Sequence, residues 1–268
     1  MSGDKDSVVE ANRLAWDRAA EHHRAHAQWR ELVEGFAEPG YSCLDEILTG
    51  HLHDLGLEDA TVAQLCCNNG RELLSARNLG AAEVVGFDQA AAFLAQAREL
   101  NAIAGLDCRF VEGDVLSLPE DFDGRFDIVF VTIGVFGWLP DLPGFFAVAA
   151  RLLKPGGAFL AYEEHPILNM FEPERAEPHR PVNSYFKPEP FVEAVSLDYY
   201  GDRDYEAPPH YWHVYGLGQI VTTCLQAGLR LELLREYPHN INAKAFDIYQ
   251  EQRAQFPLSY ALIARKPA

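Results

Sequence analysis

Seven short apolar runs, separated by stretches with helical spacing, are the feature that most constrains the fold of this chain. The runs occur at residues 61–66, 83–87, 108–111, 126–132, 157–163, 229–234 and 258–264. Most of the intervals between them carry helical patterns, such as 71–78, 89–104 and 142–153. Continuous apolar runs of this length suit strands of a parallel sheet that helices cover on both faces. We therefore predict a doubly wound α/β domain with seven strands, most of them parallel.

The segment before the first run predicts one or two amphipathic helices. Residues 8–36 are rich in Ala, Glu, Arg and His, and their apolar positions recur at helical spacing. The Pro-Gly pair within 35–41 breaks this pattern and marks a hinge. We accordingly divide the chain into an N-terminal helical cap, residues 1–40, and a main domain, residues 41–268.

The long interval between the fifth and sixth runs breaks the strand-helix rhythm. Residues 165–215 are rich in Pro, Tyr, Phe and acids. A loop of this length within a compact domain is expected to have its own structure and a function. We predict a lid inserted at about 166–215, with a strand near 191–199, ahead of a last large helix at 216–228.

Composition bears on the partners of the protein. The chain has 22 basic and 40 acidic residues, a net charge of -18, and no stripe of Lys or Arg that would neutralise phosphates. No run approaches the roughly 18 apolar residues that span a bilayer, and the first ten residues lack a secretion signal. We expect a cytoplasmic protein, monomer or homodimer, that binds a small molecule and neither nucleic acid nor membrane.

Neither the cysteines nor the histidines predict a metal site. The five cysteines are odd in number and lie mostly in apolar runs, without the spacing of metal ligands, so we expect reduced core residues. His22 and His26 are four residues apart, but no third ligand is evident. We therefore predict no metal.

The turn after the first run, residues 64–70, points to a nucleoside site. A strand, a tight turn of small residues, a helix and then Asp88 at the end of the next strand form an arrangement that binds nucleosides. Asp88 can accept hydrogen bonds from the vicinal diol of a ribose, and Gly70 lets the backbone approach a ligand. Asp114 can accept from an adenine amino group, and the Val115 N–H can donate to a ring nitrogen. The alternatives are a solvated acid at Asp88 and a turn-forming residue at Asp114.

These motifs resemble those of class I S-adenosylmethionine-dependent methyltransferases with small-molecule acceptors, which have a Rossmann-like fold. Residues 61–70 (TVAQLCCNNG) are similar to the first motif, with Gln64, Cys66 and Asn68 in place of the usual Asp, Gly and Gly. The second, third and fourth motifs and the turn before the fifth strand are matched by VVGFD at 84–88, EGDV at 112–115, FDIVFV at 126–131 and LLKPGG at 152–157.

The resemblance implies S-adenosylmethionine as cofactor and S-adenosylhomocysteine as product. It carries cofactor contacts onto ten residues of this chain: Trp16, Gln64, Cys66, Asn68, Gly70, Asp88, Gln89, Asp114, Val115 and Thr132. Trp16 belongs to a segment similar to the N-terminal cap of small-molecule members, and we expect it to close over the cofactor. A nicotinamide dehydrogenase is the rival within this architecture. Its turn, however, needs glycines beneath a pyrophosphate, where Cys66 and Asn68 carry side chains.

Candidates for catalysis follow from the place of the acceptor, which in an open parallel sheet lies beyond the carboxyl ends of the strands. His165 is the first candidate for a general base, because it titrates near neutral pH; hydrogen bonding to the lid is the alternative. Glu164 is a candidate to orient His165 or bind an amine, and His213 is a second candidate base.

We predict a methyltransferase acting on a small organic acceptor, with methylation of oxygen or nitrogen favoured. In-line transfer depends mainly on positioning within a site that excludes water. Two alternatives remain, a cofactor-binding sensor or interaction protein and a non-methyl reaction of the same cofactor.

Overall fold

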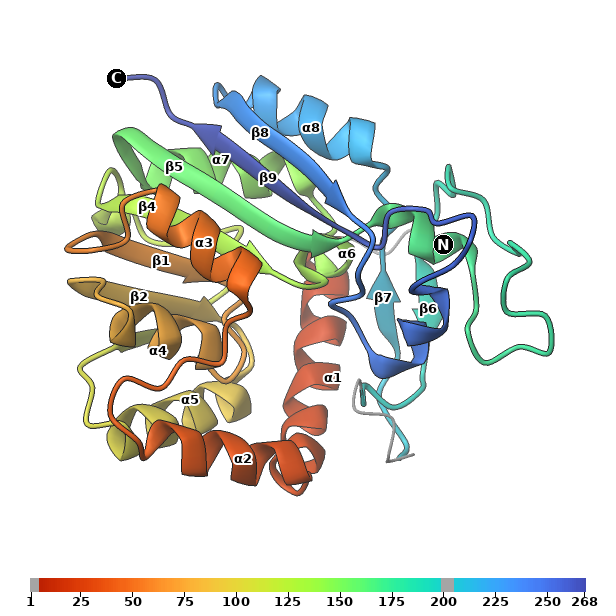
Figure 1. Cartoon of the computed structure of the whole chain (residues 1–268), viewed down its shortest axis with the longest axis horizontal. Coiled ribbons are helices and arrows are strands. Elements are labelled where there is room, and N and C mark those ends of the chain that lie inside the picture. Colours follow the sequence, from red (N-terminus) through yellow and green to blue (C-terminus); the bar gives the residue numbers. More distant parts are fainter. Residues whose placement is uncertain (1–4, 199–204) are drawn as a thin grey trace.

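The predicted seven-stranded sheet is confirmed by a computed structural model, which describes residues 5–198 and 205–268 (Figure 1). The strand order is β3-β2-β1-β4-β5-β9-β8, and neighbouring strands are parallel except that β9 is antiparallel to both β5 and β8. The strands are β1(Thr61–Leu65), β2(Glu83–Asp88), β3(Arg109–Glu112), β4(Phe126–Thr132), β5(Leu153–Glu164), β8(Arg230–Tyr237) and β9(Ser259–Arg265).

Helices cover both faces of the sheet, as expected for a doubly wound domain. They are α1(Lys5–Arg24), α2(Ala27–Phe36), α3(Glu46–Asp54), α4(Arg71–Asn78), α5(Ala91–Ile103), α6(Val135–Trp138), α7(Leu142–Leu152) and α8(Leu217–Gln226), with short 3-10 helices η1(Glu120–Phe122), η2(Pro166–Met170) and η3(Lys244–Tyr249). One buried apolar cluster joins α2 to α5 to one face, and another joins α7 and α8 to the other.

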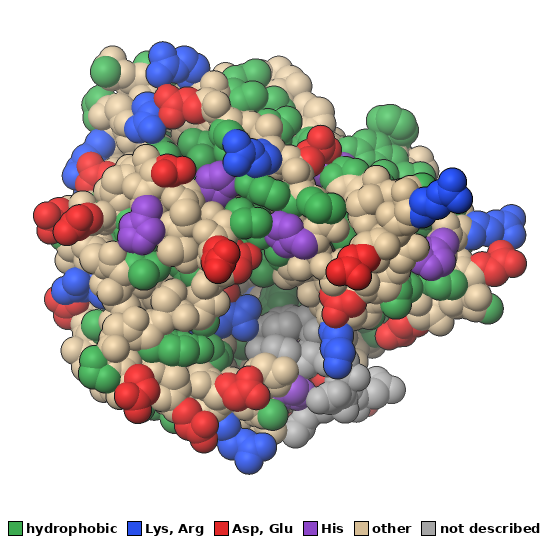
Figure 2. Space-filling model, viewed as in Figure 1, with side chains coloured by type: hydrophobic (Ala, Val, Ile, Leu, Met, Phe, Trp, Pro, Cys, Tyr) green, Lys and Arg blue, Asp and Glu red, His purple; other side chains and the backbone are tan. Residues whose placement is uncertain are grey.

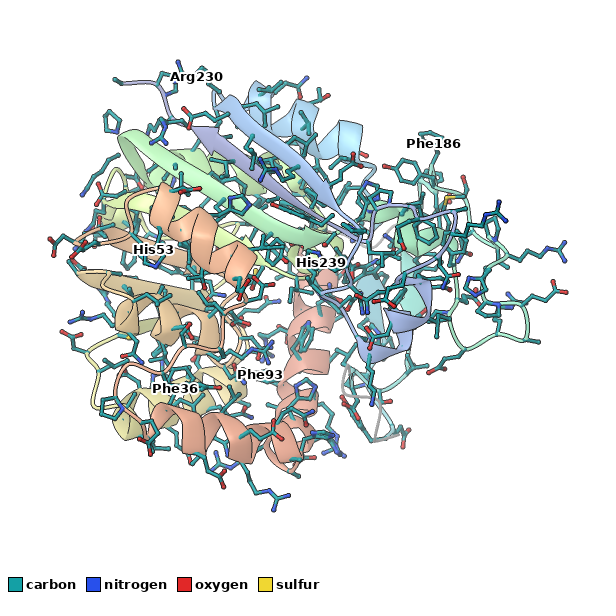
Figure 3. All side chains as sticks on the ribbon, in the orientation of Figure 1. Phe36, His53, Phe93, Phe186, Arg230 and His239 are labelled. Atoms are coloured by element: carbon teal, nitrogen blue, oxygen red, sulfur yellow. The ribbon has the colours of Figure 1, made fainter. Side chains whose placement is uncertain are left out.

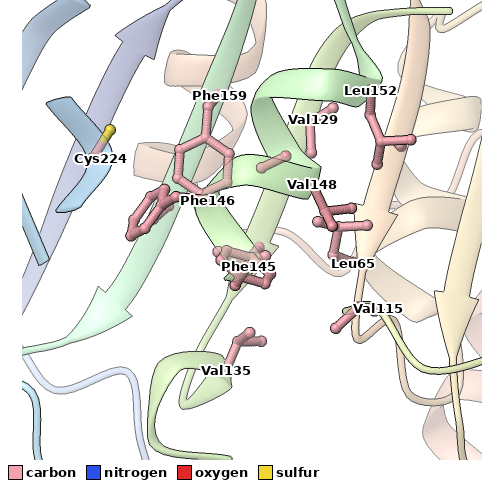
Figure 4. Packing of buried hydrophobic residues seen from close by; sticks show 14 of the residues in the cluster. Leu65, Val115, Val129, Val135, Phe145, Phe146, Val148, Leu152, Phe159 and Cys224 are labelled. Atoms are coloured by element: carbon pink, nitrogen blue, oxygen red, sulfur yellow. The ribbon is translucent and has the colours of Figure 1, made fainter. Parts of the chain in front are cut away.

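Alternation along the strands produces these two clusters, because successive side chains of a strand point to opposite faces. In β5, Phe159 and Ala161 pack on the α7 side, whereas Leu160 and Tyr162 pack on the α2–α5 side. Figure 4 shows Phe159 against the α7 side chains. The same alternation places the last two residues of β5, Glu163 and Glu164, on opposite faces at its carboxyl end.

The two helices of the predicted cap pack against different parts of the structure. Helix α2 buries Trp29, Leu32 and Phe36 in the same cluster as α3, α4 and α5. Helix α1 instead packs on α5 and β7 and stands beside the carboxyl ends of the central strands (Figure 1). Asn12 fixes α1 in place: its amide donates to the carbonyls of Trp138 and Tyr211 at 3.0 and 3.1 Å and accepts from Tyr211 N at 2.8 Å.

The segment predicted as a lid contains η2 and a small antiparallel pair, β6(Phe191–Glu193) and β7(His210–Trp212). The strand predicted at 191–199 is thus shorter than expected, and residue 199 lies outside the described residues. The inner part of the segment, including β7, lies against α1. The outer part extends into solvent, where Phe186 is 84% exposed (Figure 3).

Within residues 5–198 and 205–268, no helix combines the length and apolar character needed to cross a bilayer. The five cysteines are free thiols, as predicted, and three of them, Cys67, Cys108 and Cys224, are buried.

Candidate functional site

A cavity of about 720 Å³ opens at the carboxyl ends of the parallel strands. The chain leaves β1 toward β2 on one side, and β4 lies on the other side, so the strand order reverses between β1 and β4. In open α/β sheets, ligands bind in the crevice at such a switch point. Residues that follow β1, β2, β3 and β4 line the cavity, together with Glu164 at the end of β5.

The structure brings nine of the ten predicted cofactor contacts together in this cavity. They are Trp16, Gln64, Cys66, Asn68, Asp88, Gln89, Asp114, Val115 and Thr132. Glu164, one of the three catalytic candidates, lines the same cavity.

Gly70 does not line the cavity, and its missing Cβ serves packing instead. A Cβ there would lie 2.6 Å from the Phe110 ring and 3.1 Å from Ala97, and the residue has a φ of 72°. Glycine is needed here for the left-handed conformation before α4 and for room beside Phe110.

The turn after β1 is built from left-handed residues. Cys66 and Asn68 have φ values of 54° and 50°, a region that asparagine tolerates and that is uncommon for cysteine. Burial raises the pKa of the Cys66 thiol well above its usual value, with a further increase from the charge of Asp88. Cys66 is therefore a neutral wall of the cavity rather than a nucleophile.

Asp88 ends β2 and organises the turn. Its Oδ2 accepts from Asn68 N at 2.7 Å, and its Oδ1 accepts from Ala90 N at 2.8 Å. Burial raises the pKa of Asp88, against the lowering effect of these N–H groups. A carboxylate offers about four lone-pair positions. Each oxygen of Asp88 therefore retains acceptor capacity for one hydroxyl of a diol.

Gln64 lies deeper, beside β4. Its amide nitrogen is 3.5 Å from Thr132 Oγ1, whereas its Oε1 is buried and has no hydrogen-bond partner among the described residues. A buried polar atom without a partner is costly. An amino group of a ligand in the cavity would satisfy it.

Asp114 stabilises a turn, as expected for a turn-forming residue, because its Oδ1 accepts from Leu116 N at 2.9 Å. Across the described ranges, the structure gives its Oδ2 and the Val115 N–H no hydrogen-bond partner. The pair thus offers one acceptor and one donor to a planar heterocycle.

Aromatic rings close the cavity on the α1 side. Trp16 packs edge-on against Trp138 and Phe93, with ring centroids 5.1 and 5.8 Å apart. Figure 3 places Phe93 between α5 and α1. Trp212 of β7 packs edge-on against Trp138 at 5.1 Å, and its Nε1 donates to Asn169 Oδ1 at 2.7 Å. The rings are therefore held in fixed orientations.

Two buried carboxyls end β5. Glu163 accepts from Gly134 N at 2.5 Å and Val135 N at 2.9 Å, and so holds the turn between β4 and α6. Burial, reinforced by the charge of Glu164, raises the pKa of Glu163 to about 8. Burial likewise raises the pKa of Glu164 to about 7, against the hydrogen bond that Asn242 donates to its Oε2.

His165 does not line the cavity. Its Nδ1 accepts from Ile167 N at 3.1 Å at the start of η2, and its Nε2 lies 3.0 Å from Oε1 of Glu236. Burial lowers its pKa, partly offset by the Glu236 carboxylate. The expectation that His165 faces the acceptor is corrected, and the alternative, a hydrogen bond to the segment after β5, describes its position.

We expect His165→Ala to lower the free energy of unfolding by about 1–2 kcal/mol, the scale of a lost helix cap. The affinity for S-adenosylmethionine should stay unchanged, because the imidazole lies outside the cavity. Urea unfolding and calorimetry measure the two quantities, with His53→Ala, on the exposed side of α3 (Figure 3), as control. Loss of turnover with unaltered stability would instead support a general base.

His213 also lies outside the main cavity. Its backbone N donates to Gly137 O at 2.6 Å, and its ring stacks against Tyr215. Burial lowers its pKa. His213 lines only a small cavity of about 20 Å³ behind Trp212, too small for an acceptor.

The sequence analysis missed one wall of the cavity, the loop after β8. It contributes Asn240, Ile241, Asn242, Ala243, Lys244 and Asp247. The Asn240 side chain holds the loop by donating to the carbonyls of Asn242 and Ala243 and to Asp247. The strand pairing explains its place: β8 is parallel to β5, so the segment that follows β8 begins at the edge of the sheet where the cavity opens.

No group of three or more His, Cys, Asp or Glu side chains suited to a metal occurs in the part of the chain that the structure describes. On the face seen in Figure 2, Lys and Arg side chains lie singly among Asp and Glu. The His22 ring stacks on Tyr205, with ring centroids 3.8 Å apart.

Residues 62–157 match a family model described as a methyltransferase domain. The chain is 37% identical over 116 residues to demethylmenaquinone methyltransferase from Thermus thermophilus, covering 42% of this chain and 52% of that protein. It is 30% identical over 141 residues to cycloartenol-C-24-methyltransferase from Arabidopsis thaliana, covering 50% of this chain and 41% of that protein. The chain thus spans about half, or less, of the length of these curated relatives.

The solved structures with a similar fold include an S-adenosylmethionine-dependent methyltransferase from Mesorhizobium loti. The TM-score is 0.58 at 21% identity, over 81% of this chain and 96% of that one. At this identity the likeness shows a shared fold, which agrees with the strand order seen here.

Proposed function

We propose that this chain transfers a methyl group from S-adenosylmethionine to a small organic acceptor, because residues 62–157 match a methyltransferase domain model and the fold is shared with an S-adenosylmethionine-dependent methyltransferase. One observation carries the proposal: the half-buried Asp88 carboxylate at the end of β2, which is hydrogen-bonded to the turn after β1, lines the cavity and retains acceptor capacity.

The free groups of the cavity fit the cofactor. Asp88 would hold the ribose hydroxyls, while Asp114 Oδ2 and the Val115 N–H would hold the adenine. Gln64 Oε1, buried without a partner among the described residues, would accept from the amino group of the methionine part. No phosphate is required by this arrangement, and the side chains of Cys66 and Asn68 occupy positions where a dinucleotide site has glycines.

The bound cofactor would supply an electrophilic methyl group. The protein would position the acceptor against it and exclude water. In-line displacement gains most from holding the nucleophile, methyl group and sulfur in line, with water excluded. Here α1 with Trp16, the ring of Trp138 and the loop at 240–247 enclose the cavity. The volume of about 720 Å³ suits the cofactor with a small acceptor better than a polymer segment.

Calorimetry with S-adenosylmethionine and S-adenosylhomocysteine tests the first part of the proposal, and transfer of labelled methyl into a metabolite extract tests the second. We expect both compounds to bind and the label to enter a small molecule. Binding without transfer to any acceptor would favour a cofactor-binding sensor. Absence of binding would refute the proposal.

A further inference from the structure

Glu164, at the end of β5, is the carboxyl of that strand that lines the cavity. Only one of its two oxygens has a hydrogen-bond partner among the described residues. It is 9% exposed, and its Oε2 accepts the hydrogen bond from Asn242. Its Oε1 accepts none from the residues that the structure describes. A buried carboxyl that lines a cavity and has an oxygen without a partner can accept a hydrogen bond from a donor group of a ligand.

No cationic side chain of the described residues forms an ion pair with Glu164. Lys244 lines the same cavity without pairing with it. The lining as a whole is acidic, with six carboxyls against two cationic side chains: Glu72, Asp88, Asp114, Glu164, Asp198 and Asp247 against Arg71 and Lys244. A cavity lined mostly by one sign of charge concentrates ligands of the opposite sign.

Aromatic faces stand in the same cavity. Trp16, Trp138 and Trp212 line it, and these are three of the four tryptophans of the chain. Trp138 makes edge-on contacts with both of the others, at centroid distances of 5.1 Å. Tryptophan faces attract organic cations, and aromatic walls combined with carboxylates are a recurrent way to bind ammonium groups.

Resting on the proposed function, we propose that the acceptor is a small primary or secondary amine that arrives as a cation and that Glu164 both binds and deprotonates. Asn242 orients the carboxylate by holding Oε2, and Oε1 receives the ammonium. The tryptophans surround the organic part of the amine. Glu164 thereby becomes the residue that selects amines over alcohols and acids.

The step balances as follows. The Glu164 carboxylate takes one proton from the ammonium, which leaves a neutral amine with a free electron pair. That pair forms the new nitrogen–carbon bond to the methyl group, and the pair of the broken carbon–sulfur bond stays on sulfur. The sulfonium charge is thus transferred to the methylated ammonium, and the proton leaves Glu164 to solvent as the product departs.

Binding to the wild-type protein saturated with S-adenosylhomocysteine tests the inference without knowledge of the natural acceptor. The probes are matched pairs of amine and alcohol, such as phenethylamine with 2-phenylethanol and tryptamine with tryptophol, together with the matching acids. We expect amines to bind and to raise the unfolding temperature, and their alcohol and acid partners to bind more weakly. Failure of S-adenosylhomocysteine to bind would refute the proposed function itself, whereas its binding with no preference for amines would refute only this inference.

Glu164→Gln keeps the shape of the side chain and removes its charge. We expect it to weaken amine binding by about 10- to 100-fold, the scale of hydrogen bonds to a charged group, and to leave the affinity for S-adenosylhomocysteine unchanged. Glu120→Gln makes the same change on an exposed residue outside the cavity and should alter neither affinity. Glu164→Asp keeps the charge and should keep the preference for amines even where it weakens binding. Equal amine affinity in wild type and Glu164→Gln would overturn the assignment.

Discussion

Asp88→Ala should weaken the binding of S-adenosylmethionine by about 1.5–3 kcal/mol, which is about 10- to 150-fold in the dissociation constant. The loss has two sources. The acceptors for the ribose hydroxyls disappear, and the N–H groups of Asn68 and Ala90 lose the carboxylate that fixes the turn. Isothermal titration calorimetry with S-adenosylmethionine and S-adenosylhomocysteine measures the effect.

Two further variants separate these sources. Asp88→Asn keeps an oxygen that can accept from Ala90 N but points an amide donor at Asn68 N, so we expect an intermediate loss of affinity. Asp121→Ala removes an exposed aspartate of η1 and should leave affinity at the wild-type value. An unchanged dissociation constant in Asp88→Ala, in a protein that still unfolds cooperatively, would remove Asp88 from the cofactor site.

The sheet could be predicted because its strands carry their own signal. The run 126–132 is apolar except for Asp127 and Thr132, since both faces of β4 are largely buried, and the observed bounds of β4 and α4 are those predicted. The position of the cavity was predictable for a related reason. In a parallel sheet, strand order alone brings the residues after β1, β2 and β3 to one edge.

The departures in the first motif are also explained by backbone geometry. Cys66 and Asn68 stand where glycines are usual in the family that the motif resembles, and the structure gives both a positive φ. Asparagine adopts this conformation at little cost, so Asn68 is a natural substitute for glycine. The turn is therefore preserved although its sequence differs.

The part of the cavity formed by the end of β5 and the loop after β8 was harder to predict because it depends on tertiary contacts. His165 and Glu164 are neighbours in sequence, but Glu164 is still in β5 while His165 begins η2 and faces Glu236. Which of the two enters the cavity depends on the alternation of β5 and on its exact end. The loop at 240–247 has no apolar periodicity, and only the pairing of β8 with β9 places it over the site.

We expect the free energy of unfolding to fall as pH rises between about 4.5 and about 8, because of the buried pair Glu163 and Glu164. In the unfolded chain both carboxyls lose their protons near the ordinary value of 4.5, whereas burial raises the folded pKa of Glu163 to about 8 and that of Glu164 to about 7. Between these limits the folded state binds more protons than the unfolded state. Stability must then decrease with pH, by up to about 1.4 kcal/mol per pH unit for each proton of difference.

Urea unfolding across this range measures the slope, and Glu164→Gln identifies its source. The variant removes one of the two carboxyls and the charge that raises the pKa of the other, so its stability should depend less on pH. Acids whose pKa is lowered, such as Asp141 beside the Lys5 ammonium, act below this window. The net charge of -18 also weakens the folded state as acids ionise, but Glu120→Gln changes that charge equally and should keep the wild-type slope. Parallel curves for wild type and Glu164→Gln would mean that Glu164 ionises alike in both states, and the cavity would then lack the buried carboxyl on which amine selection depends.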